Sequence, residues 1–238
     1  MSQSHDLHPP VAEKFEAKDA GVLPKALLGI GAAGILVSTL GLFVEQWRTQ
    51  FAHSWLFAFT YFLTICLGCL FWNCLHHATD SEWSVVIRRQ VENLASLFPY
   101  FALFFVPIFV SLGILYKWWN MDPSSEPLLL AKQPYLSKPF FLIRAAAYFI
   151  VPSLVALALR RRSIRQDGDG DSAHSFMMRK LGVGGIPAVA LSITFTGVDW
   201  LMGLDYKWFS TMWGVYLFAG AAGSSMSLIV LVITALKS

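Results

Sequence analysis

Six long apolar runs constrain this chain more than any other feature of its sequence. Each is close to the ~20 residues that an α-helix needs to cross the hydrocarbon core of a bilayer. Because lipid offers no partner to bare backbone N–H and C=O groups, each run is expected to be a helix. Polar stretches separate the runs, which cover about residues 26–44, 55–75, 95–116, 140–159, 181–198 and 211–236.

Composition also favours a membrane protein. Of the 238 residues, 55% are hydrophobic and only 14% are charged, whereas ordinary globular domains have about 25% charged residues. We therefore expect an all-α fold, a polytopic transmembrane helical bundle. Residues 1–25 form a polar tail. The tail lacks the basic segment, apolar segment and cleavage site that follow one another in a signal peptide. The domains expected are this tail and a transmembrane helical domain over residues 26–238.

Basic residues predict the orientation of the bundle, because Lys and Arg accumulate in short cytoplasmic loops. With six spans, the side that holds the N-terminus collects twelve basic residues and the other side six. Both termini and the arginine-rich loop at Arg160–Arg165 are therefore expected to be cytoplasmic. The net charge of +3 reflects this asymmetry, and we expect the lipid bilayer and no nucleic acid as a partner.

The segment Thr79–Leu94 differs from the spans because it is amphipathic. Thr79 and Glu82 have the spacing of a capping box. At helical spacing, the apolar positions are Trp83, Ile87, Val91 and Leu94, and the other side carries Arg88, Arg89 and Glu92. The segment is either a helix on the cytoplasmic surface or a charged extension of the third span.

A metal or haem site is not expected. Cys66 and Cys69 form a C-x-x-C inside an apolar run, without the second ligand pair that a zinc or iron–sulfur site needs. Leu70 stands where a c-type haem motif requires histidine. His76 and His77 are adjacent at one end of a span, rather than facing each other at mid-depth on two helices.

Charge within FTGVDWLMGLDYKWFSTMWGVYLFAG, residues 195–220, needs an explanation. An acidic group at the end of a membrane helix is costly unless it is paired or wetted, so it is a candidate for contact with a proton or a quinone hydroxyl. Arg144 is expected at the same depth and could pair with Asp199, or could instead extend toward the headgroups. The candidates for quinone contact or proton transfer are Arg144, Asp199, Asp205, His76 and His77.

Aromatic residues in the same stretch predict an interfacial belt, since Trp and Tyr concentrate at headgroup depth. The expected belt residues are Trp200, Tyr206, Trp208 and Trp213.

Four segments carry a family resemblance: HHATDSEWSVVIRRQVENL, YLSKPFFLIRAAAYF, RSIRQDGDGD and residues 195–220. In this order and spacing, the chain from about Thr60 onward resembles the second NrfD-like membrane subunit of bacterial alternative complex III, a quinol:cytochrome c oxidoreductase. The resemblance implies an NrfD-like four-helix bundle plus part of a second. It also implies a multi-pass subunit of the bacterial inner membrane that supports quinol oxidation, and proton transfer, without a redox metal of its own.

The partners implied are a homologous NrfD-like membrane subunit, an iron–sulfur subunit and multihaem c-type cytochrome subunits, with a terminal oxidase as a further neighbour. A quinone, menaquinone or ubiquinone, is the one candidate ligand, and the chain alone would not be catalytic. Family members have about ten membrane helices and this chain has six, which suggests truncation. Tyr206 and Lys207 depart from the family pattern before WFST. A structural membrane anchor and half of a secondary transporter stay open as alternatives.

Overall fold

The computed structural model describes residues 22–81 and 84–237. These residues form helices and turns and no strand, and six of their helices are long and apolar enough to cross a membrane. The chain is therefore an all-α polytopic membrane protein. Most of the expected polar tail, residues 1–21, lies outside the described residues. The chain divides into two compact units, residues 1–51 and 52–238, and each is described by itself.

The first unit contains α1 (Leu23–Phe43), the short η1 (Glu45–Trp47) and the first turn of α2. Pro24 lies in the first turn of α1, where its fixed φ suits a helix and its missing N–H is not needed. The turn after α1 is tight: a Cβ on Gly41 would lie 2.9 Å from the Cβ of Phe51. Arg48 Nε donates to the carbonyl of Leu42 at 2.9 Å across this turn.

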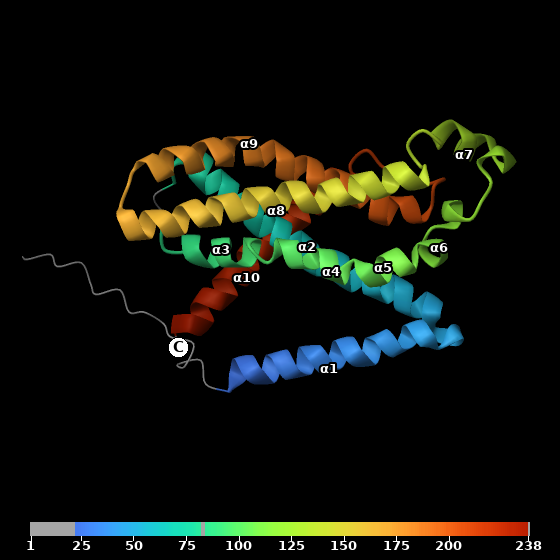
Figure 1. Cartoon of the computed structure of the whole chain (residues 1–238), viewed down its shortest axis with the longest axis horizontal. Coiled ribbons are helices and arrows are strands. Elements are labelled where there is room, and N and C mark those ends of the chain that lie inside the picture. Colours follow the sequence, from blue (N-terminus) through green and yellow to red (C-terminus); the bar gives the residue numbers. More distant parts are fainter. Residues whose placement is uncertain (1–21, 82–83, 238) are drawn as a thin grey trace, which may run out of the picture. The chain divides into compact units, whose positions relative to one another are not determined.

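Long helices form the frame of the second unit. They are α2 (Arg48–Thr79), α8 (Lys138–Asp169), α9 (Ala173–Thr196) and α10 (Trp213–Lys237). Helices α8 and α9 run antiparallel and side by side (Figure 1). Gly170, with φ of 67°, ends α8 and donates its N–H to the carbonyl of Gln166, which is the left-handed helix ending that glycine favours.

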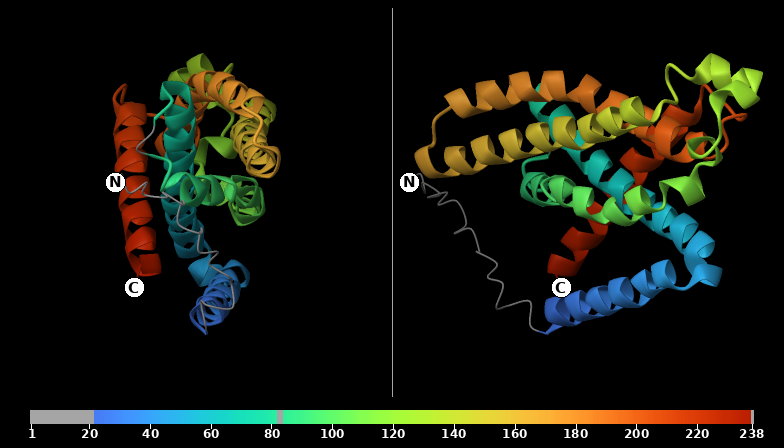
Figure 2. Two further views of the ribbon diagram at one scale, coloured as in Figure 1. Left: turned by 90° about the vertical axis from the view of Figure 1, so that its left-hand side faces the viewer. Right: turned by 45° about the vertical axis from the view of Figure 1, so that its right-hand side comes forward.

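Small residues let the helices of the second unit approach closely, as is common between membrane helices. A Cβ on Gly68 of α2 would lie 2.1 Å from the carbonyl oxygen of Ala221 on α10. Trp72 Nε1 donates to the carbonyl of Ala222 at 3.0 Å in the same crossing. Figure 2 shows α2 and α10 alongside one another. A Cβ on Gly182 of α9 would likewise lie 2.6 Å from the carbonyl oxygen of Cys74 on α2.

The third span is helical but interrupted. It is built from α3 (Arg88–Ala95), η3 (Phe98–Tyr100), α4 (Phe101–Phe104), α5 (Val106–Val110) and α6 (Leu112–Leu115). Pro99 and Pro107 lie at the starts of η3 and α5, where proline lacks the N–H that a continuous helix would use. Each proline therefore restarts the helix instead of continuing it.

The segment Thr79–Leu94 contains a turn and most of a short, partly buried helix. Helix α2 ends at Thr79, and Asp80 reverses the chain with φ of 55°. Glu82 and Trp83, which belong to the expected capping box and apolar face, lie outside the described residues. Glu92 is buried, so it does not belong to an outer polar face as its spacing had indicated. Helix α3 leads into the third span, which matches the second of the two alternatives.

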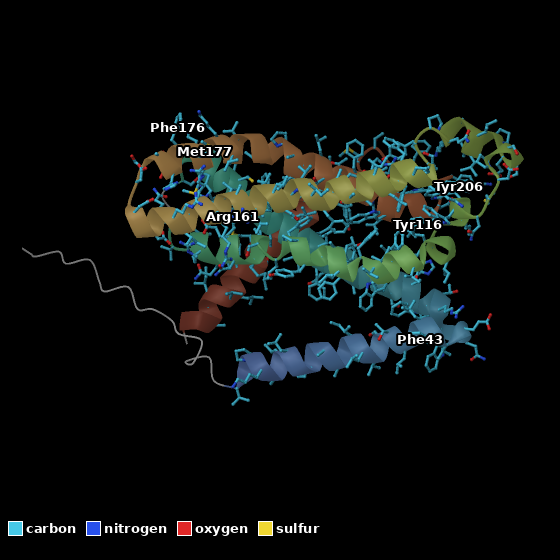
Figure 3. All side chains as sticks on the ribbon, viewed as in Figure 1. Phe43, Tyr116, Arg161, Phe176, Met177 and Tyr206 are labelled. Atoms are coloured by element: carbon cyan, nitrogen blue, oxygen red, sulfur yellow. The ribbon has the colours of Figure 1, made fainter. Side chains whose placement is uncertain are left out.

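A strap of short elements, which we define as residues 116–137, connects the third span to α8. It contains η4 (Lys117–Trp119), η5 (Pro123–Ser125) and α7 (Pro127–Lys132). Figure 3 shows Tyr116 and Tyr206 at the end of the bundle beside α7, whereas Arg161, Phe176 and Met177 lie at the opposite end. The strap therefore covers one end of the second unit.

Candidate functional site

Helix α8 supplies the two central polar side chains of the candidate site. Arg144 and Tyr148 are four residues apart, which places them one above the other on the same face of a helix. Both belong to the buried face of α8. Arg144 lies less than two turns from the helix start at Lys138, so the site is at the strap end of the bundle.

The end of α9 supplies the carboxylate. After Thr196 the helix widens into a π-turn, η6 (Gly197–Leu201), a feature often found at functional sites. Asp199 is only 2% exposed within it. The turn packs tightly, because a Cβ on Gly197 would lie 2.2 Å from Leu217 Cδ1. Trp213 Nε1 donates to the carbonyl of Gly197 at 3.2 Å and ties the turn to α10.

Arg144 and Asp199 form a two-pronged ion pair. Arg144 Nε donates to Asp199 Oδ2 at 2.8 Å, and Nη2 donates to Oδ1 at 3.0 Å. Such fork-shaped pairs are both stronger and more specific in geometry than single contacts. Of the two alternatives that the sequence left open for Arg144, the structure shows the pairing with Asp199.

Four further contacts complete the surroundings of the ion pair. Tyr148 donates its hydroxyl to Asp199 Oδ2 at 2.6 Å. Arg144 Nη1 donates to the carbonyl of Tyr135 at 2.8 Å, and the guanidinium carbon lies 3.8 Å from the ring centroid of Tyr135 and 4.4 Å from that of Phe140. We call Asp199, Arg144, Tyr148 and Tyr135 the Asp199 cluster. The cluster thus brings together a carboxylate, a guanidinium and a phenol hydroxyl, which are groups that can bind and pass on a proton.

Two buried donors, one in this cluster and one next to it, have no hydrogen-bond partner among the described residues. They are the hydroxyl of Tyr135 and Nε1 of Trp200. Burial, and then the negative charge of Asp199, raises the pKa of Tyr135, so its hydroxyl stays protonated and a donor. Buried donors are nearly always satisfied in proteins, so each of these two groups is a candidate donor to a water or a ligand group.

Trp200 lies inside the bundle, contrary to the expected aromatic belt. Its side chain is 1% exposed. Its ring lies 4.9 Å from that of Phe105, 5.5 Å from Phe149 and 5.6 Å from Phe59, measured between centroids. The π-turn explains the difference, because it buries Trp200 together with its neighbour Asp199. Trp200 and the three phenylalanines around it therefore form an aromatic wall beside the Asp199 cluster.

The other expected belt residues lie in and after the turn that follows η7 (Met202–Leu204). Tyr206 is buried, Trp213 is half-buried and Trp208 is exposed. Asp205 is exposed and its Oδ1 accepts from the backbone N–H of Lys207 at 3.0 Å. The structure thus makes Asp205 a turn residue and does not bring it into the Asp199 cluster.

His76 and His77 lie at the other end of the second unit. They line a small cavity of about 140 Å³ together with Asp80, Ser84 and Arg88. His77 Nε2 is 3.8 Å from Glu92 Oε1, and Arg89 donates to Glu92 Oε2 at 2.8 Å. Arg89 also donates to Asp167 near the end of α8. At 1.5 Å per residue, Asp167 is about 34 Å along α8 from Arg144.

Sequence reasoning missed Tyr148, Tyr135 and Glu92 as members of polar clusters. Tyr148 could have been found, because it is one helical turn from Arg144 on the same face. Tyr135 gave no such signal, since its contact depends on how the strap folds back over α8. Glu92 lies on the same side of its helix as Arg88 and Arg89, as expected, but this side is covered at Glu92.

Within residues 22–81 and 84–237, no group of three or more His, Cys, Asp and Glu residues is placed to hold a metal ion. Comparison with family models and with curated proteins finds no match to this chain.

Proposed function

We propose that this chain is a membrane subunit of a quinol-oxidising complex of the alternative complex III type, a quinol:cytochrome c oxidoreductase of the bacterial inner membrane. In this proposal it has no redox centre of its own and works beside a homologous NrfD-like subunit, an iron–sulfur subunit and multihaem c-type cytochromes. The proposal rests on the four-segment resemblance and on the six helices able to span a membrane.

One observation gives the proposal its chemistry: the buried contact of Asp199 with Arg144 and Tyr148. Oxidation of a quinol releases protons, so a subunit that supports it needs a proton acceptor near the membrane surface. An ionisable group in a membrane segment is a functional candidate by default, because burial is costly. In the proposed role Asp199 accepts, Tyr148 relays and Arg144 holds the carboxylate in place.

The surroundings of the Asp199 cluster suit a quinone headgroup. Quinone carbonyl oxygens accept hydrogen bonds, and the hydroxyl of Tyr135 and Nε1 of Trp200 are donors without a partner among the described residues. The aromatic wall of Phe59, Phe105 and Phe149 around Trp200 offers ring faces and edges to a flat ligand. These residues would orient a headgroup, while Asp199 would take its proton.

The test is turnover of the assembled complex carrying Asp199→Asn. Asparagine keeps the shape of the side chain but is a far weaker proton acceptor, and loss of a general base typically costs about 10²–10⁴-fold. We expect quinol oxidation per c-type haem to fall at least about tenfold, while the haem content of the purified complex stays near that of the wild type. Asp205→Asn is the matched control, because Asp205 is exposed and six residues away.

Unchanged turnover in an assembled Asp199→Asn complex would refute the proton-accepting role. Loss of assembly without loss of turnover per haem would favour the structural-anchor alternative. One observation favours that alternative: both carboxylate oxygens of Asp199 have hydrogen-bond donors within this chain. Tyr148→Phe separates the two readings further, because it removes the relay proton and leaves the ion pair.

A further inference from the structure

The strap closes the Asp199 cluster off at its end of the bundle. The carbonyl of Tyr135, in the strap, accepts a hydrogen bond from Arg144, and the ring of Tyr135 stacks on the guanidinium. The turn at residues 202–207 leads directly out of the π-turn that holds Asp199. Whatever reaches the carboxylate from this side must therefore pass between the strap and this turn.

The two ends of the strap are held in different ways. At the inner end, Tyr116 donates its hydroxyl to the carbonyl of Trp200 at 3.0 Å, and Trp118 Nε1 donates to the carbonyl of Gly203 at 3.2 Å. Both side chains are buried. These buried hydrogen bonds have no competing water, so this end is a firm anchor.

At the outer end, Leu129 of α7 is buried, whereas the polar contacts are ionic and partly exposed. Lys207 Nζ donates to Glu126 Oε1 at 2.8 Å, and the hydroxyl of Tyr206 donates to Glu126 Oε2. Lys132 Nζ adds a bond to the carbonyl of Tyr206 at 2.6 Å. The side chains of Lys207 and Glu126 are 58% and 32% exposed. We call Glu126, Tyr206 and Lys207 the latch.

We infer that residues 126–136 form a lid that opens at the latch, while Tyr116 and Trp118 keep the inner end of the strap in place. Exposed ion pairs contribute little and are screened by salt, so the latch is the weaker of the two attachments. Opening removes the carbonyl and ring of Tyr135 from Arg144 and lets water reach Asp199. The claim that protons pass when the lid opens rests on the proposed function. The claim that the lid opens does not.

Charge in the latch makes the lid sensitive to pH. The hydrogen bonds from Lys207 and Tyr206 lower the pKa of Glu126. Ionised Glu126 therefore stabilises the closed lid fully above the ordinary carboxyl pKa, and this stabilisation is lost as pH falls through the lowered pKa. Bonding to Glu126 raises the pKa of Lys207 and of Tyr206, so their contribution is complete below their ordinary values and is lost at high pH. The lid is therefore closed near neutral pH and opens in acid.

Other charged groups near the latch do not change this direction. Lys132 donates to the carbonyl of Tyr206 and not to Glu126. Asp205 accepts from the backbone N–H of Lys207 rather than from its ammonium. Asp122 accepts from the backbone N–H of Ser124 within the strap, which lowers its pKa. Glu126 is therefore the group whose protonation releases the lid.

Hydrogen–deuterium exchange of the full chain in lipid nanodiscs tests the inference. Glu126→Gln removes the charge of the latch, and we expect amides of residues 126–136 to exchange about two- to fivefold faster, as loss of an exposed pair allows. Amides of residues 116–119 should not change. The wild type should show the same acceleration in 0.5 M salt, and at acid pH after correction for the intrinsic exchange rate.

Asp122→Asn is the matched control, because it removes one carboxylate from the same strap while asparagine still accepts the bond from Ser124. Unchanged exchange at residues 126–136 in both Glu126→Gln and high salt would overturn the lid, as would equal acceleration at residues 116–119. Faster exchange together with normal turnover of Asp199→Asn would keep the lid and refute the proposed function. The two ideas therefore fail separately.

Discussion

Replacing Arg144 with methionine tests how far the Asp199 cluster depends on its charge balance. Methionine keeps an apolar stem of similar length but removes the guanidinium, so Asp199 stays buried with only the hydroxyl of Tyr148 bound to it. Breaking a buried ion pair by removing one partner typically costs about 3–5 kcal/mol. The carbonyl of Tyr135 loses its donor in the same step.

Thermal unfolding can be followed with a thiol-reactive fluorophore, because Cys66, Cys69 and Cys74 are free and buried in the folded chain. In a chain of this size, 1 kcal/mol shifts the midpoint by about 2–4 °C. We therefore expect Arg144→Met to lower the midpoint by about 6–20 °C. Arg161→Met is the control, because Arg161 is an exposed residue of the same helix with no ion pair among the described residues.

The double variant Arg144→Met with Asp199→Leu should recover much of the loss, since it removes the uncompensated charge as well as its partner. A midpoint for Arg144→Met within about 2 °C of the Arg161→Met control would refute the reasoning. So would a double variant as unstable as the sum of the two single variants. Either result would mean that the carboxylate is satisfied without Arg144.

Two further predictions concern packing and topology. Gly68→Ala should lower the free energy of unfolding by about 1–3 kcal/mol, because it forces α2 away from the carbonyl of Ala221. Gly220→Ala is the control and should not lower the thermal midpoint, because there is open space around Gly220. Equal midpoints for the two variants would contradict the close crossing. Cysteines at Ser124 and Ser172 should react with a membrane-impermeant maleimide from opposite sides of the membrane in oriented vesicles. Labelling of both from one side would contradict the expected orientation.

The pairing in the Asp199 cluster was one of two alternatives that the sequence left open for Arg144, because depth alone narrows the choice of partners without deciding it. Asp199 and Arg144 are each close to the same end of an apolar run, and a buried charge needs a counter-charge. The third partner, Tyr148, follows from Arg144 by helical periodicity. Tyr135 does not follow, because its contact requires the folded path of the strap between two spans.

Local pattern failed where the helix geometry departs from 3.6 residues per turn. Trp200 appeared to be a belt residue by its position near the end of a span, but the π-turn at Gly197–Leu201 carries it inward beside Asp199. Glu92 failed for a different reason. Its helical spacing placed it opposite the apolar side chains, yet Arg89 and Arg88 surround it and allow a buried carboxylate. Helical spacing indicates which residues share one side of a helix. Ion pairs between those residues determine whether a charged side can be buried.

The position of the two buried carboxylates along the bundle limits how a proton could reach Asp199. Arg144 and Asp167 mark the two clusters and are about 34 Å apart along α8, slightly more than the ~30 Å of a hydrocarbon core. Between them, the buried face of α8 continues from Tyr148 through the apolar side chains of Pro152, Ala156 and Leu159 before it reaches Ser163. The three apolar side chains cannot carry a proton. Along α8, exchange with Asp199 is therefore expected from the strap side, where Tyr135 covers Arg144 and the latch holds the strap.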